Sequence, residues 1–202
     1  MSIEGREPSA MSRLFRRILV WFYRKRGWKA EGRLPTERRF ILVAAPHTSN
    51  WDFVNFLGLT EDLGLYPRFM AKESLFRWPW RNFLFDMGGV PVERSSRQNY
   101  VQQMIEEFGR RDDFVLTVAP EGTRSHASEW KTGFYHIAVG ANVPIILGFM
   151  DYARKIGGIG AVIQPSGNFA RDMKKMAEFY AGVTPRFPEK ATDYRSIVND
   201  AG

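Results

Sequence analysis

The sequence contains no cysteine, which excludes disulfide bridges, cysteine-ligated metal sites and a cysteine nucleophile. It also lacks an apolar run near the roughly 20 residues that span a bilayer, so no transmembrane helix is expected. The longest uninterrupted apolar runs cover residues 18–23, 40–46 and 143–150. Apolar residues still make up 44% of the chain and aromatic residues 14%. One packed domain is therefore expected rather than a disordered chain.

Acidic residues are missing from positions 8–30, where seven Lys and Arg residues fall. Helical winding gathers the large apolar residues of this segment on one face: Met11, Leu14, Phe15, Ile18, Leu19, Trp21 and Phe22. A basic helix with one apolar face is typical of a helix lying in an anionic membrane interface. A helix packed on the domain with solvated charges is the alternative. We expect residues 1–32 to form this helix and its lead-in, and residues 33–202 to form the main domain.

The whole chain carries 29 Lys and Arg against 22 Asp and Glu, a net charge of +7. Such an excess predicts an anionic binding partner. Lipid headgroups are favoured over nucleic acid because no helix-turn-helix, zinc-finger or RNP-like signature accompanies the charge. No signal peptide is expected either, since Arg and Lys follow the short apolar run at 18–23,. We therefore predict a cytoplasmic protein held peripherally at the inner face of the membrane.

Buried strands alternate with amphipathic helices along the chain. Strands are expected at 38–45, 68–71, 89–93, 114–119, 143–150 and 159–163. Helices are expected near 51–64, 97–110, 133–141 and 171–180, with a broken helix at 74–86 and a loosely ordered tail after residue 182. Continuous apolar runs in strands indicate burial on both faces. The pattern predicts a single α/β domain with a central mixed, largely parallel sheet flanked by helices.

His47 and Asp52 stand five residues apart, on a turn between a buried strand and a helix. Such a turn can bring the carboxylate to one ring nitrogen and leave the other free as a base. In open α/β sheets, ligands bind at the carboxyl ends of strands. A helix-capping His with a surface Asp is the alternative interpretation.

Two more strand ends carry candidate binding residues. Gly122 in Pro-Glu-Gly-Thr-Arg-Ser permits close backbone approach to a ligand, and Arg124 and Lys131 suit an anion such as phosphate,. Arg94 ends a third strand that begins with Gly89. Taken alone, each of these residues also fits an ordinary surface turn.

Together the segments 47–52, 89–94, 120–125 and 143–146 resemble, in order and spacing, the four sequence blocks of the glycerolipid acyltransferase family. That family includes the lysophosphatidate (1-acylglycerol-3-phosphate) acyltransferases. The resemblance implies an acyl group moved from acyl-CoA or acyl-carrier protein to the hydroxyl of a lysolipid, with 1-acylglycerol-3-phosphate as the leading acceptor. It implies no metal and no cofactor besides the acyl donor.

The resemblance also implies roles for individual residues. His47 would act as general base, oriented by Asp52, so that the freed oxygen attacks the thioester directly. The substrate-binding residues, most of them for an anionic group of the acceptor, would be Lys72, Arg94, Glu121, Gly122, Thr123, Arg124 and Lys131.

The sequence departs from the family pattern at two places. Pro46 precedes the histidine where Asn is common, and Leu147-Gly148 replaces a second proline in the fourth block. These departures bear on the acceptor more than on the reaction. Two alternatives are an acyl-thioesterase, with water as acceptor, and a non-catalytic protein that binds anionic lipid on the same fold.

Overall fold

A computed structural model describes residues 7–92, 97–127 and 129–194. One sheet runs through the protein, with strand order β1-β7-β6-β2-β5-β3-β4. Its strands are β1 (Lys29–Glu31), β2 (Arg39–Ala44), β3 (Arg68–Lys72), β4 (Gly89–Val92), β5 (Phe114–Val118), β6 (Ile145–Asp151) and β7 (Ile156–Ile163). All neighbouring strands pair in parallel except β6 and β7, which are antiparallel. The predicted mixed, largely parallel sheet is confirmed.

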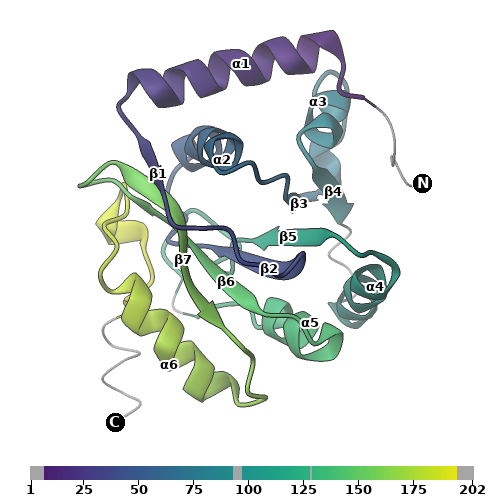
Figure 1. The fold of residues 1–202 in the computed structure, drawn as a ribbon, viewed down its shortest axis with the longest axis vertical. Coiled ribbons are helices and arrows are strands. Elements are labelled where there is room, and N and C mark those ends of the chain that lie inside the picture. The colour runs from purple at the N-terminus through teal and green to yellow at the C-terminus, as the bar shows by residue number, and fades with distance from the viewer. Residues whose placement is uncertain (1–6, 93–96, 128, 195–202) are drawn as a thin grey trace.

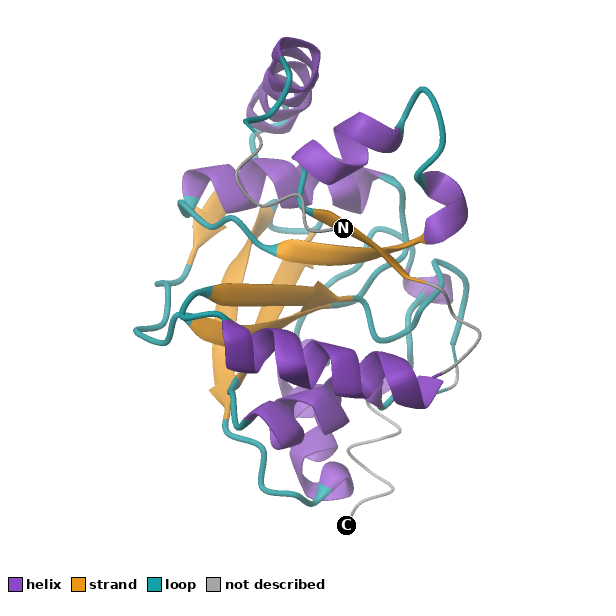
Figure 2. Ribbon diagram, turned by 90° about the vertical axis from the view of Figure 1, so that its right-hand side faces the viewer, coloured by secondary structure: helices purple, strands orange, loops and turns teal. Residues whose placement is uncertain are grey.

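Helices cover both faces of this sheet (Figures 1 and 2). They are α1 (Ala10–Lys25), α2 (Trp51–Asp62), α3 (Arg81–Asp86), α4 (Arg97–Arg110), α5 (Gly133–Ala141) and α6 (Phe169–Tyr180), with short 3-10 turns η1 (Glu73–Leu75) and η2 (Pro188–Lys190). Helices α4, α5 and α6 pack against the face with the larger apolar core. Helix α2 covers the opposite face.

Strand β2 lies at the centre of the sheet and is buried on both faces. Ile41 and Val43 point into the core under α4, α5 and α6, whereas Phe40 and Leu42 point toward α2. This alternation follows from the two-residue period of a strand. It also explains the continuous apolar run, because each side of the strand has its own helix layer to bury it.

Helix α1 lies outside the sheet layers and crosses α2 (Figure 1). It contacts the domain along a narrow face that includes buried Val20 and Tyr23, with an ion pair of 3.2 Å from Arg16 to Glu61. Most of the predicted apolar face is exposed, although the Phe15 ring also contacts Phe83 of α3, with ring centres 4.9 Å apart. Its exposed members are Met11, Leu14, Phe15, Ile18, Trp21 and Phe22. Among the described residues, no helix is long and apolar enough to cross a membrane.

Strand β1 has no counterpart in the sequence prediction. Its three residues pair in parallel with β7, from Lys29 opposite Ile156 to Glu31 opposite Gly158. Three residues carry no periodicity to detect, and the pairing strand lies far away in the sequence. The division of the chain at residue 32 stays a prediction, while β1 joins the segment after α1 to the central sheet.

The segment after α6 packs against the domain instead of forming the loose tail expected from its composition. Val183, Thr192 and Tyr194 are buried. The Tyr152 amide donates a hydrogen bond of 2.8 Å to the Thr184 carbonyl. The segment thereby reaches the carboxyl ends of β2, β5 and β6, the edge of the sheet at which the predicted site residues gather.

Candidate active site

The turn that joins β2 to α2 brings His47 and Asp52 into contact. His47 Nδ1 lies 3.0 Å from Asp52 Oδ2. The same carboxylate oxygen accepts hydrogen bonds from the amides of Thr48, at 3.0 Å, and Ser49, at 2.9 Å. An ionised carboxylate only accepts, so the Nδ1 proton stays on His47 and leaves Nε2 free as a base. The predicted pair is therefore assembled, with 26% of the His47 side chain and 5% of the Asp52 side chain exposed.

A tyrosine from the end of β6 completes the set of donors around Asp52. The Tyr152 hydroxyl donates to Asp52 Oδ1 and itself accepts a hydrogen bond of 3.1 Å from Asn55 Nδ2. Burial, followed by the bond to Asp52, raises the pKa of the Tyr152 phenol, so it stays a donor,. Tyr152 was not predicted from the sequence. Its position directly after a buried strand parallel to β2 was the available signal.

Glu121, just beyond β5, lies behind His47 and is buried. Its Oε1 accepts hydrogen bonds from the His47 amide, at 3.1 Å, and from the Tyr194 hydroxyl, at 3.2 Å. Desolvation raises the pKa of the Glu121 carboxyl despite these donors,. In this arrangement Glu121 holds the backbone of the turn that carries His47. Its predicted contact with the acceptor stays a prediction, and Tyr194 is a second residue that the sequence did not indicate.

The Lys131 side chain lies against Gly122. Gly122 adopts a positive φ of 64°, and a side chain at this position would collide with the Lys131 ammonium,. The Lys131 amide also donates a hydrogen bond of 2.9 Å to the Pro120 carbonyl. Thr123 and Arg124 are exposed on the same turn. This loop therefore presents two cations beside the residue that bonds the His47 backbone.

The other two predicted basic residues are Lys72 and Arg94. Arg94 lies outside the described residues. Lys72 is the last residue of β3, where its backbone pairs with Val92 of β4. The register puts the ends of these two strands at the same edge of the sheet as His47, since β3 is also parallel to β5.

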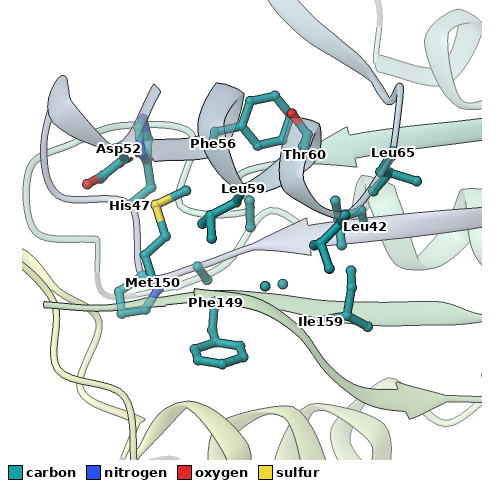
Figure 3. Close-up of a pocket in the computed structure, with 16 residues that line it drawn as sticks. Leu42, His47, Asp52, Phe56, Leu59, Thr60, Leu65, Phe149, Met150 and Ile159 are labelled. Atoms are coloured by element: carbon teal, nitrogen blue, oxygen red, sulfur yellow. Dashed lines mark hydrogen bonds and ion pairs between the residues drawn. The ribbon is translucent and has the colours of Figure 1, made fainter. Parts of the chain in front are cut away.

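An apolar cavity of about 50 Å³ runs from the His47 turn between α2 and the sheet (Figure 3). His47, Asp52 and Met150 lie at one end, and Leu42, Leu65 and Ile159 at the other. Leu59 and Thr60 of α2 form part of its wall. A cavity of this lining accommodates hydrocarbon rather than polar groups. His47 thus lies at one end of a small apolar cavity.

Several known proteins are similar to this chain in sequence or in fold. The family model described as Acyltransferase matches residues 28–147, which include all four sequence blocks. The 1-acyl-sn-glycerol-3-phosphate acyltransferase of Haemophilus influenzae is 29% identical over 144 residues, which cover 64% of this chain and 58% of that protein. The enzyme of the same name from Escherichia coli is 28% identical over 130 residues, 59% of this chain and 51% of that protein. The chain thus spans between 51% and 58% of the length of these relatives.

One solved structure has the same fold. The crystal structure of the 1-acyl-sn-glycerophosphate acyltransferase PlsC from Thermotoga maritima matches with a TM-score of 0.56 and 23% identity. The match covers 78% of this chain and 72% of that chain. At this identity the likeness concerns the fold, whereas the family model covers more than half of the sequence. The chain belongs to the Acyltransferase family.

Proposed function

We propose that this protein transfers a fatty acyl group from a thioester, acyl-CoA or acyl-carrier protein, to the free hydroxyl of a lysolipid such as 1-acylglycerol-3-phosphate. The observation that carries the proposal is the 3.0 Å contact between His47 Nδ1 and Asp52 Oδ2. It leaves Nε2 as a base on a side chain that is about a quarter exposed. The names of the matched relatives support the choice of acceptor.

The reaction follows from this geometry. Nε2 of His47 removes the hydroxyl proton as the oxygen attacks the thioester carbonyl. The carbon–sulfur bond then breaks, and the proton on His47 passes to the leaving thiolate. Asp52 stabilises the imidazolium that exists between these two transfers. No covalent acyl-enzyme and no cofactor besides the donor are needed.

The surroundings of His47 suit two parts of the substrates, the acyl chain and the acceptor phosphate. The small apolar cavity beside His47 is where the acyl chain enters. Lys131 and Arg124, on the loop next to Glu121, hold the phosphate of the acceptor, with Arg94 and Lys72 as further predicted ligands. Thr123 adds a hydroxyl on the same turn.

Helix α1 provides the contact with the membrane in this proposal. Its exposed face combines the large side chains Ile18, Trp21 and Phe22 with Lys25, which lies 4.9 Å from the Trp21 ring. Aromatic and aliphatic side chains next to cations suit an interface of anionic headgroups. We place the protein peripherally on the cytoplasmic leaflet, where such lipids give a negative surface.

Thiol release from acyl-CoA, followed with a thiol-reactive dye, tests the proposed reaction. The chain has no cysteine and so adds no background. We expect release that depends on added lysolipid and is lost in His47→Ala. The exposed His136 on α5 offers a matched control, and His136→Ala should keep full activity. Release without any acceptor would instead identify a thioesterase, and no release with either donor would contradict the proposal.

A further inference from the structure

Two arginines from opposite parts of the chain lie against one indole ring. The guanidinium carbon of Arg26, at the end of α1, lies 4.4 Å from the centre of the Trp51 ring. That of Arg186, in the segment between α6 and η2, lies 5.7 Å from the same ring. Both side chains are partly buried. The tertiary fold thus brings both guanidinium groups within 5.7 Å of one ring centre, and no sequence block accounts for either.

Both arginines lie next to the turn that carries His47 and Asp52. Trp51 directly precedes Asp52, and Arg186 lies 5.9 Å from the centre of the Tyr152 ring, whose hydroxyl bonds Asp52. The amide of Phe187 also donates a hydrogen bond of 3.3 Å to Thr48 Oγ1. The pair therefore lies on the Asp52 side of His47. Lys131 and Arg124 belong to the other side, where the Glu121 loop bonds the His47 backbone.

Neither Arg26 nor Arg186 has a carboxylate within ion-pairing distance in the part of the chain that the structure describes. Arg24, two positions before Arg26 on α1, instead pairs with Asp62 at 3.0 Å. A guanidinium group without an ion-pair partner can form charge-assisted hydrogen bonds with a bound anion. Stacking on an aromatic ring also orients the planar guanidinium fork, which suits phosphate oxygens.

We infer that Arg26 and Arg186 form a second phosphate-binding site, which takes a phosphate group of the acyl donor. The inference rests on the proposed function, which brings two phosphate-bearing substrates to His47. The acceptor phosphate occupies the cations of the Glu121 loop in that proposal. The donor phosphate then binds on the Asp52 side, and the thioester carbonyl lies between the two anion sites. Coenzyme A and acyl-carrier protein both carry a phosphate ester on the arm that ends in the thiol, so the site serves either donor.

Direct binding tests the site without any turnover. Calorimetry compares coenzyme A, 4′-phosphopantetheine and pantetheine, which lacks phosphate, on the wild type, Arg26→Gln and Arg186→Gln. Arg171 is exposed on the first turn of α6, and Arg171→Gln is a control for the loss of one charge. We expect each arginine variant to weaken both phosphate-bearing ligands by about tenfold, the effect of one charge-assisted hydrogen bond. Binding that is equal in all four proteins would overturn the inference.

Kinetics then distinguishes the donor from other sources of phosphate. In Arg186→Gln, KM for acyl-CoA should rise about tenfold, while KM for an acyl N-acetylcysteamine thioester and for the lysolipid stays unchanged. A rise in KM for the lysolipid alone would assign the site to the acceptor and overturn the inference. Weaker binding to phosphatidylglycerol vesicles, with coenzyme A binding intact, would assign the site to membrane lipid and would also overturn the inference.

The two proposals can fail separately. Binding of coenzyme A that depends on Arg186, in a protein without transferase activity, would support the site and contradict the proposed function. Transferase activity with an unchanged KM for acyl-CoA in both arginine variants would support the proposed function and overturn the site. Melting temperatures identify any variant that folds poorly, and Arg26→Gln decides the question if Arg186→Gln is unstable.

Discussion

The Tyr152 hydroxyl donates a hydrogen bond to Asp52 Oδ1 over a distance of 2.5 Å, although the two residues are 100 positions apart in the sequence. The other carboxylate oxygen, Oδ2, serves His47 and the backbone amides of the turn. Each oxygen of Asp52 thus has its own task. Oδ2 holds the His47 ring, and Oδ1 accepts the hydrogen bond from Tyr152 at the end of β6.

Replacement of Tyr152 by Phe should lower kcat by about tenfold, because a hydrogen bond to a charged group contributes about 1.5–3 kcal/mol. Asp52 loses its donor at Oδ1 and Asn55 loses its acceptor, while the ring and its contact with Trp28 are kept. The orientation of His47 should suffer more than substrate binding. Steady-state kinetics should therefore show little change in KM for either substrate. An unchanged kcat, or a rise in KM alone, would show that Tyr152 does not position the catalytic pair.

Glu121 gives a prediction about stability and pH. Burial raises the pKa of this carboxyl above its ordinary value of 4.5,. A group with a raised pKa in the folded state contributes its full stability below its unfolded pKa, and that contribution is lost as pH rises through the folded pKa. Glu121→Gln keeps the acceptor oxygen for His47 and Tyr194 and removes the titration. The melting temperature of the variant relative to the wild type should therefore increase as pH rises above about 4.5.

Thermal melts of both proteins over a range of pH check this expectation. The offset between the two curves at low pH is not informative, because the Gln amide replaces an Oε2 atom that has no hydrogen-bond partner among the described residues. The slope of the difference carries the information. A difference in melting temperature that stays constant with pH would mean that the pKa of Glu121 is not raised in the folded protein.

Local patterns predicted most of the fold. The helices α4 and α5 begin and end where their apolar spacing placed them, at Arg97–Arg110 and Gly133–Ala141. Strand β2 was recognisable because its run of apolar residues is buried on both faces,. Strand β1 was missed because pairing with a distant strand, rather than its own sequence, makes it a strand.

The candidate site was predictable only as far as its residues are neighbours in sequence. His47 and Asp52 share one turn, so their spacing indicated the contact. Tyr152, Tyr194 and Arg186 reach the same place from later segments, and no local pattern shows such an approach. The inward direction of the Glu121 side chain could not be predicted either. Its carboxylate accepts a hydrogen bond from Tyr194, which is distant in the sequence.

The exposed face of α1 predicts binding to anionic vesicles. Ile18 is 42% exposed and Trp21 is 53% exposed, and burial of one large apolar side chain contributes about 1.5–3 kcal/mol. The double variant Ile18→Glu/Trp21→Glu should therefore reduce co-sedimentation with phosphatidylglycerol vesicles by at least about tenfold. Val139 is 44% exposed on α5, beyond the opposite face of the sheet, and Val139→Glu should leave vesicle binding intact. Equal losses in both proteins would contradict a role for α1.

The cavity between α2 and the sheet predicts how acyl-chain length is selected. Thr60 is buried in its wall, two helical turns beyond Asp52, and its hydroxyl bonds the Leu57 carbonyl at 3.2 Å. Thr60→Leu adds volume at this depth, so long chains should be excluded while short chains still reach His47. One methylene in an apolar pocket changes kcat/KM by about 10–200-fold, and the ratio of kcat/KM for long over short acyl donors should fall by about tenfold. Thr60→Val keeps the volume and removes the hydroxyl, so it should preserve the wild-type preference. A Thr60→Leu enzyme that slows equally on all chain lengths would show that the acyl chain does not enter this cavity.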